Sequence, residues 1–132
     1  MGLDMYAATV PARAIGNFQL DPNLKAAEKA GFVVNNDFAY WRKFNHLHGW
    51  MERLYHAKGG TEEFNCVGVR LMPEDIDRLE SDFAQNKLTA TRGFFFGSPE
   101  LDESDAASVP IFIAKCREAF ADDLAVVYSS WW

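Results

Sequence analysis

At 132 residues the chain fits one domain and is too short for the two lobes of a nucleotide-binding enzyme. Hydrophobic residues make up 48% and aromatic residues 14% of the chain, which excludes intrinsic disorder because a folded core can be built. The formal net charge of -6 disfavours direct binding to duplex DNA, since phosphate contacts require cations. This composition favours protein partners.

The cysteine content and the hydropathy indicate a cytoplasmic protein. Cys66 and Cys116 allow at most one disulfide, and no cationic start followed by an apolar run precedes them. The longest purely apolar stretches are far shorter than the roughly 20 residues that cross a bilayer. We therefore expect reduced thiols and no membrane span.

The first half of the chain predicts a strand, an irregular excursion and a long helix. Residues 3–10 predict a short strand. Glycines and prolines punctuate residues 13–35, which predicts an irregular excursion with a weakly helical centre. Residues 38–57 predict a helix that Asn36 or Asp37 caps and that a Lys-Gly-Gly sequence ends.

A basic stripe is expected on that helix, opposite its apolar face. Its members are Arg42, His46, Gly49, Arg53 and His56. A glycine inside a helix is less favourable than alanine by about 1 kcal/mol, so a protein segment, a strand or a small anion is expected close to Gly49. With Arg92 and Gly93, the stripe forms a candidate anion cradle, although no Walker or dinucleotide-binding motif is present. An ordinary solvated helix face is the alternative.

The second half of the chain contains five more predicted elements. They are a strand over residues 64–71, a helix opened by Pro73, a short strand over residues 89–98, a helix from residue 104 or 108 to about 121, and a closing strand over residues 124–130. The element order predicts one small α+β domain over residues 1–132. About three helices are expected on one face of a mixed sheet of about four short strands.

The residues offer little for catalysis. On one helix, His46 and His48 point about 200° apart and cannot converge on a metal ion. Cys66 and Cys116 are expected in a strand and a helix, where thiols are usually inert. A hydrolase that uses Asp4, His46 and a bound metal is the least favoured hypothesis. We expect no cofactor, and a binding protein is favoured over an enzyme.

Acidic residues concentrate in residues 72–105, where nine carboxylates face three cations. This region predicts a negative docking surface for a basic patch on a partner, with a solvated surface as the alternative. The terminal indoles either tuck against the body of the domain or anchor a partner or a second copy in a homodimer. The candidate partner-binding residues are Glu74, Asp75, Asp77, Glu80, Asp82, Glu100, Asp102, Glu103, Trp131 and Trp132.

Several short motifs resemble those of a family of small, mostly uncharacterised bacteriophage and prophage proteins. They are MGLDMY at residues 1–6, YWRK with a following Asn and His at residues 40–46, Trp50, GFFFGS at residues 93–98, and a serine-aromatic ending at residues 129–132. The resemblance implies a phage-encoded protein in the host cytoplasm. Accessory phage proteins of this size and acidity often bind and block a host protein, so we expect an anti-defence or anti-CRISPR role.

Two hypotheses of different classes follow. The first is a non-catalytic inhibitor that binds and blocks a host protein, for example a nucleic-acid-handling defence enzyme, through the acidic region and exposed aromatic residues. The second is a protein that binds or sequesters a small anion or nucleotide with the basic stripe.

Overall fold

A four-stranded sheet in the order β2-β1-β4-β3 organises the chain, and the computed structural model describes residues 2–93 and 96–132. Its strands are β1 (Asp4–Pro11), β2 (Asn35–Arg42), β3 (Val69–Leu71) and β4 (Leu124–Trp131). The helices are α1 (Leu24–Lys29), α2 (Asn45–Ala57), α3 (Pro73–Ala84) and α4 (Glu103–Ala121), with a short 3-10 turn, η1 (Ala12–Ala14). A single small α+β domain is therefore confirmed. Each strand pairing is antiparallel, in place of the expected mixed sheet.

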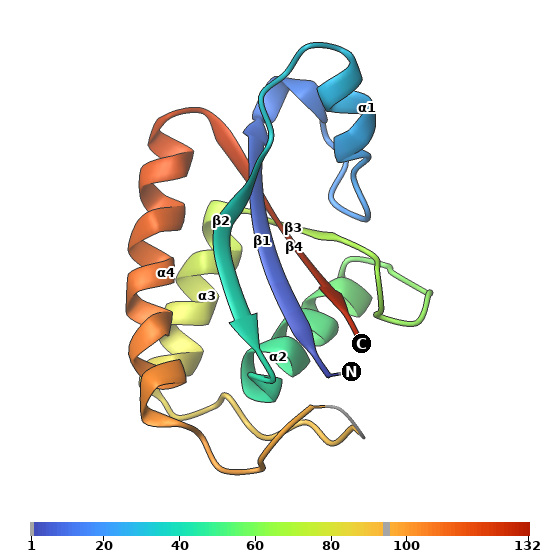
Figure 1. Cartoon of the computed structure of the whole chain (residues 1–132). Helices are drawn as coiled ribbons and strands as arrows, with labels where there is room; N and C mark the ends of the chain where they lie inside the picture. The colour runs from blue at the N-terminus through green and yellow to red at the C-terminus, as the bar shows by residue number, and fades with distance from the viewer. Residues whose placement is uncertain (1, 94–95) are drawn as a thin grey trace.

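The two terminal strands form the centre of the sheet. β1 and β4 pair over their whole length, from Asp4 opposite Trp131 to Pro11 opposite Leu124. The pairing brings the two chain ends together at one end of the sheet (Figure 1). Residues at both ends of the sequence can therefore share one surface.

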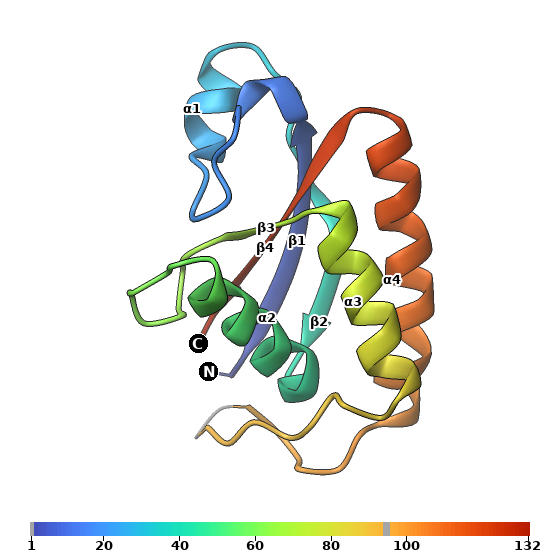
Figure 2. The same cartoon turned by 180° about the vertical axis from the view of Figure 1, so that it is seen from behind.

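One face of the sheet, here called the inner face, carries the main core. Met5 and Ala7 of β1 alternate with outward residues, and so do Val126 and Tyr128 of β4; all four are buried in the main hydrophobic cluster. Helices α2, α3 and α4 lie on this side of the sheet (Figure 2). The alternation of period two thus sends one set of side chains under the helices.

The opposite face, the outer face, is only partly covered. Val10, Ala125 and Val127 form a second small cluster with Ile15 and Ala27. These last two belong to the segment between β1 and β2, which confirms the predicted excursion with its short helix. The excursion covers one end of the outer face and leaves the other end, near the chain termini, without an element over it (Figure 1).

The prediction of a long helix over residues 38–57 is wrong for the first part of this range. Residues up to Arg42 pair with β1 as β2, the chain turns at Lys43 with a left-handed φ of 57°, and α2 begins at Asn45. A short apolar run is ambiguous between strand and helix, and pairing with the long β1 decides it here. The expected caps Asn36 and Asp37 therefore lie in a strand.

The strand expected over residues 64–71 shortens to β3, because Cys66 adopts a left-handed φ of 63° and interrupts it. The strand expected over residues 89–98 is absent from the described residues of that range, which exclude 94 and 95. The helices after Pro73 and after residue 102 are confirmed as α3 and α4. The side chain of Asp102 caps α4 by accepting hydrogen bonds from the amides of Ser104 and Asp105.

Candidate functional site

The basic stripe does not form one surface. Arg42 lies on β2, while His46 and Gly49 are buried under the loop that follows α3. Arg53 and His56 remain exposed on α2. The prediction of an outward stripe is therefore wrong, because it assumed one continuous helix through Arg42.

Asn45 at the start of α2 holds this loop in place. Its Nδ2 donates to the carbonyl oxygens of Phe96 at 3.2 Å and Ser98 at 2.7 Å, and its Oδ1 accepts from the Thr91 amide at 2.9 Å. His46 Nε2 lies 3.1 Å from the Pro99 carbonyl oxygen. The Asn45 side chain thus pairs with backbone groups of residues 91–98 that a neighbouring strand would otherwise have paired. This segment therefore satisfies these groups without forming a strand.

Gly49 is the position where this loop comes closest to α2. A Cβ atom added to Gly49 would lie 1.8 Å from the Thr91 Oγ1. A protein segment, rather than a strand or an anion, is what approaches this glycine. The neighbouring Arg92 and Gly93 are exposed, so the anion cradle expected from them and the stripe is not assembled.

Five of the eight acidic candidates make contacts within the domain, although Asp77 and Glu80 among them keep exposed side chains. Asp75 is 4% exposed and its Oδ2 lies 2.5 Å from Lys58 Nζ, which makes it unavailable to a partner and corrects that prediction. Arg117 pairs with Asp77 and with Glu80, and its guanidinium lowers the pKa of Glu80. Of the five remaining acidic candidates, Asp82 accepts a hydrogen bond from the Trp50 indole and Asp102 caps α4. The other three, Glu74, Glu100 and Glu103, are exposed.

The two terminal indoles have different surroundings. Trp132 is held against the domain, since its Nε1 donates to the Phe64 carbonyl oxygen at 3.0 Å and its ring contacts Phe96 edge-on. Asn65 also bonds its backbone at both N and O. Trp131 is 63% exposed. Only Trp131 therefore remains available as an anchor.

Exposed aromatic side chains gather on the uncovered part of the outer face. Tyr6 pairs with Tyr40 across β1 and β2, and Asp4 pairs with Arg42 on one side and with Trp131 on the other. Residues opposite one another in a sheet point to the same face, so these five side chains share one surface. Tyr40 is 56% exposed and Tyr6 36%. We call this surface the aromatic face.

Asp4 fixes the side chains around it. The Tyr40 hydroxyl donates to Asp4 Oδ1 at 2.6 Å, and Arg42 Nη1 lies 3.5 Å from the same oxygen. The hydrogen bond to Asp4 raises the pKa of Tyr40. The rings of Tyr6 and Tyr40 lie 5.4 Å apart. These contacts hold Tyr40 and Arg42 in the aromatic face before anything binds to it.

A hollow of about 410 Å³ adjoins the aromatic face. Ser129 lines it and pairs with Tyr6, which makes the hollow and the aromatic face continuous. Its other walls include the exposed Cys66 and the segment that begins at Asp21, whose carboxylate accepts a hydrogen bond from the Gly68 amide at 3.0 Å.

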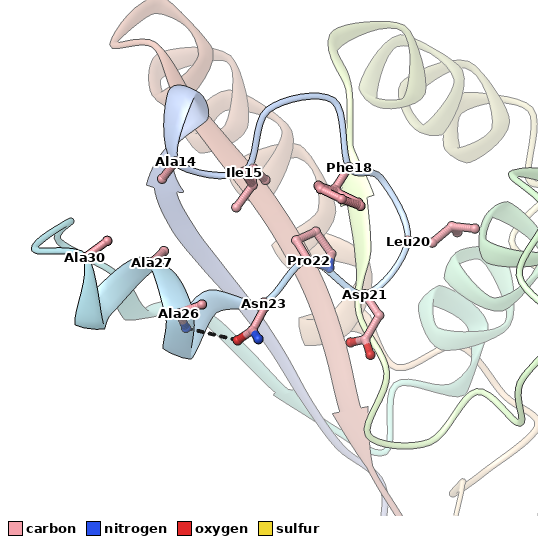
Figure 3. A pocket seen from close by; sticks show the side chains of 10 residues that line it. All are labelled: Ala14, Ile15, Phe18, Leu20, Asp21, Pro22, Asn23, Ala26, Ala27 and Ala30. Carbon is pink, nitrogen blue, oxygen red and sulfur yellow. Dashed lines mark hydrogen bonds between the residues drawn. The ribbon is translucent and has the colours of Figure 1, made fainter.

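A second hollow of about 370 Å³ shares the lining residues Asp21, Pro22 and Asn23 with the first (Figure 3). Small side chains of α1 form one wall, and Ile15, Phe18 and Leu20 of the loop form the other. Asn23 orders the first turn of α1 by accepting a hydrogen bond from the Ala26 amide at 3.0 Å. The lining is mainly apolar, so this hollow offers no group for acid–base chemistry apart from the exposed Asp21.

The groups considered for catalysis do not converge. Asp4 lies on the outer face, whereas His46 is buried beside the Pro99 carbonyl on the helix side. Burial raises the pKa of the Cys116 thiol to about 12, which makes it a poor nucleophile. In residues 2–93 and 96–132, no group of three or more His, Cys, Asp and Glu side chains could hold a metal ion. The described helices also include none that is long and apolar enough to span a bilayer.

Comparisons of the chain with family models, with curated proteins and with solved structures found no match. Sequence analysis found Arg42 and Trp131 as candidates but missed Tyr6 and Tyr40. The alternation of exposed and less exposed side chains along residues 39–42 becomes visible only in the structure, and the predicted helix over this segment placed Tyr40 on an apolar face.

Proposed function

We propose that this chain is a non-catalytic binding protein that occupies a functional surface of another protein with its aromatic face. One observation carries the proposal: Tyr6, Tyr40 and Trp131, from three adjacent strands, are exposed together on the part of the sheet that no element covers. Clustered exposed aromatic residues are unfavourable in a monomer and typically mark an interaction surface.

The residue types on this face favour a protein partner. Tyr, Trp and Arg are the residues most enriched at energetic hot spots of protein interfaces. The contacts of Asp4 with Tyr40 and Arg42 restrict their rotamers before binding, which lowers the entropy lost on association. The expected partner surface offers apolar recesses to the rings and a donor–acceptor pair to Arg42 and Asp4.

Single-stranded nucleic acid is the main competing occupant, since exposed aromatics on a four-stranded sheet also stack bases. Such sites combine stacking with a basic groove that follows the backbone. The only cation in the aromatic face, Arg42, already faces the carboxylate of Asp4, and the whole chain carries a net charge of -6. Charge therefore favours a protein over a nucleic acid.

The resemblance of several motifs to those of phage and prophage proteins suggests the biological setting of the proposal. In that setting the partner is a protein of the bacterial host, and blocking a defence enzyme is the favoured role. The proposed binding surface differs from the acidic region first expected, in which Asp75 is buried against Lys58 and the exposed Asp77 and Glu80 already pair with Arg117.

Affinity capture from host lysate with matched variants tests the proposal. The tagged wild-type chain should retain one host protein at near-stoichiometric amount, and the Y40S/W131S variant should lose it. I111S is the matched control, because Ile111 is another large exposed hydrophobic residue, 63% exposed, on α4. The control should capture the same protein as the wild type.

Three results would contradict the proposal. Capture that Y40S/W131S leaves unchanged would remove the aromatic face from the interface. Capture that nuclease treatment abolishes would indicate nucleic acid as the occupant. A stable homodimer that Y40S/W131S dissociates would show that a second copy covers this face.

A further inference from the structure

A basic cleft lies between α2 and α3, on the helix side of the sheet and apart from the aromatic face. It has a volume of about 240 Å³. Three cations and one carboxylate contribute to its walls, namely Arg53, Arg78, Lys87 and Asp82. Trp50, Leu54 and Ala57 complete the lining. The cleft therefore combines an apolar wall with a concentrated positive charge in an acidic protein.

The three cations have no ion-pair partner in the described chain. The ion pairs of residues 2–93 and 96–132 involve Arg42, Lys58 and Arg117 instead. Arg117 illustrates the contrast, because two carboxylates of α3 neutralise it. Like charges that share a cleft repel one another, and a bound anion would relieve that repulsion.

Asp82 does not form the ion pair with Arg78 that its position four residues further along α3 predicts. Arg78 and Asp82 are four residues apart on α3, the separation at which ion pairs form on a helix. Asp82 Oδ2 instead accepts a hydrogen bond from the Trp50 indole Nε1 at 2.9 Å. The indole thereby holds the carboxylate while the guanidinium of Arg78 remains unpaired.

We infer that this cleft binds the phosphate group of a small molecule, either free phosphate or a phosphate ester. Guanidinium groups donate paired hydrogen bonds that match tetrahedral oxyanions, and the lysine ammonium adds a point charge. The volume lies below the roughly 300–1,000 Å³ of sites for drug-sized ligands, so it fits a compact anion. Arg53 alone comes from the basic stripe; Arg78 and Lys87 were not among the expected ligands.

Titration by nuclear magnetic resonance at low ionic strength tests this inference, with the Trp50 indole N–H as the reporter in the cleft. Inorganic phosphate, pyrophosphate and glycerol 3-phosphate serve as three separate probes. Each should shift the Trp50 resonance in a saturable way. Tighter binding of glycerol 3-phosphate than of the inorganic probes would identify an ester as the ligand, and the reverse order would identify a free phosphate.

Variants make the test specific. R53Q/R78Q should weaken binding about tenfold or more, because two charge-assisted contacts are lost. D82N should strengthen binding, since it removes the one negative charge and keeps an oxygen that can accept from Trp50. K25Q/K29Q is the matched control, because it removes the same charge from exposed positions on α1 and should bind like the wild type.

The inference is overturned if none of the probes shifts the Trp50 resonance, or if K25Q/K29Q weakens binding as much as R53Q/R78Q does. Binding that D82N weakens would also contradict it. The Y40S/W131S variant should bind the probes normally, so failure of the cleft and failure of the aromatic face can be distinguished.

Discussion

The inner and outer faces of one sheet use aromatic residues in opposite ways. On the inner face, Trp41 and Phe112 are buried and lie edge-to-face, with ring centroids 4.9 Å apart. On the outer face, Tyr40, the neighbour of Trp41 in sequence, is 56% exposed. Adjacent residues of one strand thus lie in the core and on the proposed binding surface, because the pleat sends them to opposite sides.

The largest expected effect is on the inner face. F112A should lower the free energy of unfolding by about 3–5 kcal/mol, because it removes a buried ring and leaves a cavity against Trp41 and Phe38. Urea denaturation of the variant and the wild type measures the difference. A loss below about 1 kcal/mol would mean that the inner face is not packed as described.

The next effect concerns His48, which is buried among aromatic rings with Nδ1 2.7 Å from the Tyr128 hydroxyl. Burial lowers its pKa from 6.5 to about 4. The unfolded chain therefore binds the proton more tightly, and the contribution of His48 to stability is complete above pH 6.5 and is lost as the pH falls towards 4. The loss should reach about 3 kcal/mol.

Melting curves across this pH range, for the wild type and H48Q, separate His48 from the carboxylates. H48Q should be less stable at neutral pH, because it changes a buried hydrogen-bonded group, and its stability should fall less steeply between pH 6.5 and 4. Parallel curves for the two proteins would contradict the assignment.

A smaller effect is expected where the loop after α3 contacts α2. G49A should lower the free energy of unfolding by about 1–3 kcal/mol, although alanine favours an isolated helix, because the added methyl group would overlap Thr91. The double variant G49A/T91G should recover part of this loss in urea denaturation. A stabilising effect of G49A alone would show that the loop does not dock here.

The smallest effect on stability belongs to the aromatic face. W131A should change the free energy of unfolding by less than about 0.5 kcal/mol, since the ring has no element above it. The same denaturation measurement checks this value. A large loss would mean that Trp131 contributes to folding, and the contrast between the two faces would fail.

Much of the architecture could be predicted from local patterns. Pro73 opens α3, Asp102 caps α4, and the apolar run from Leu124 forms β4. These signals are short-range, and each one agrees with the final packing. The α+β class follows from them, whereas the expected number of strands agrees only because the missed strand β2 offsets the expected strand over residues 89–98, which is absent from the described part of that range.

The segment from Asn35 to Ala57 was harder to predict because its outcome depends on a distant strand. β1 pairs with residues 35–42, and Lys43 then turns with a left-handed φ that lysine seldom adopts, so no local signal separates strand from helix. This error placed Arg42 on a helix and concealed Tyr40 as its neighbour on the aromatic face.

Both proposed sites combine residues that are far apart in sequence. Tyr6, Tyr40 and Trp131 meet only because β1 lies between β2 and β4. Arg53 of α2 and Lys87, which follows α3, line one cleft only because the fold brings these two segments together. A periodic pattern within one element could indicate one member of each set but not the others.

Site-specific photocrosslinking at position 131 tests the central claim most directly. A photoreactive phenylalanine analogue in place of Trp131 should crosslink the host protein that the wild type captures, and the same group in place of Ile111 should not. The account predicts one crosslinked partner from position 131. Equal crosslinking from both positions, or crosslinking from neither, would contradict it.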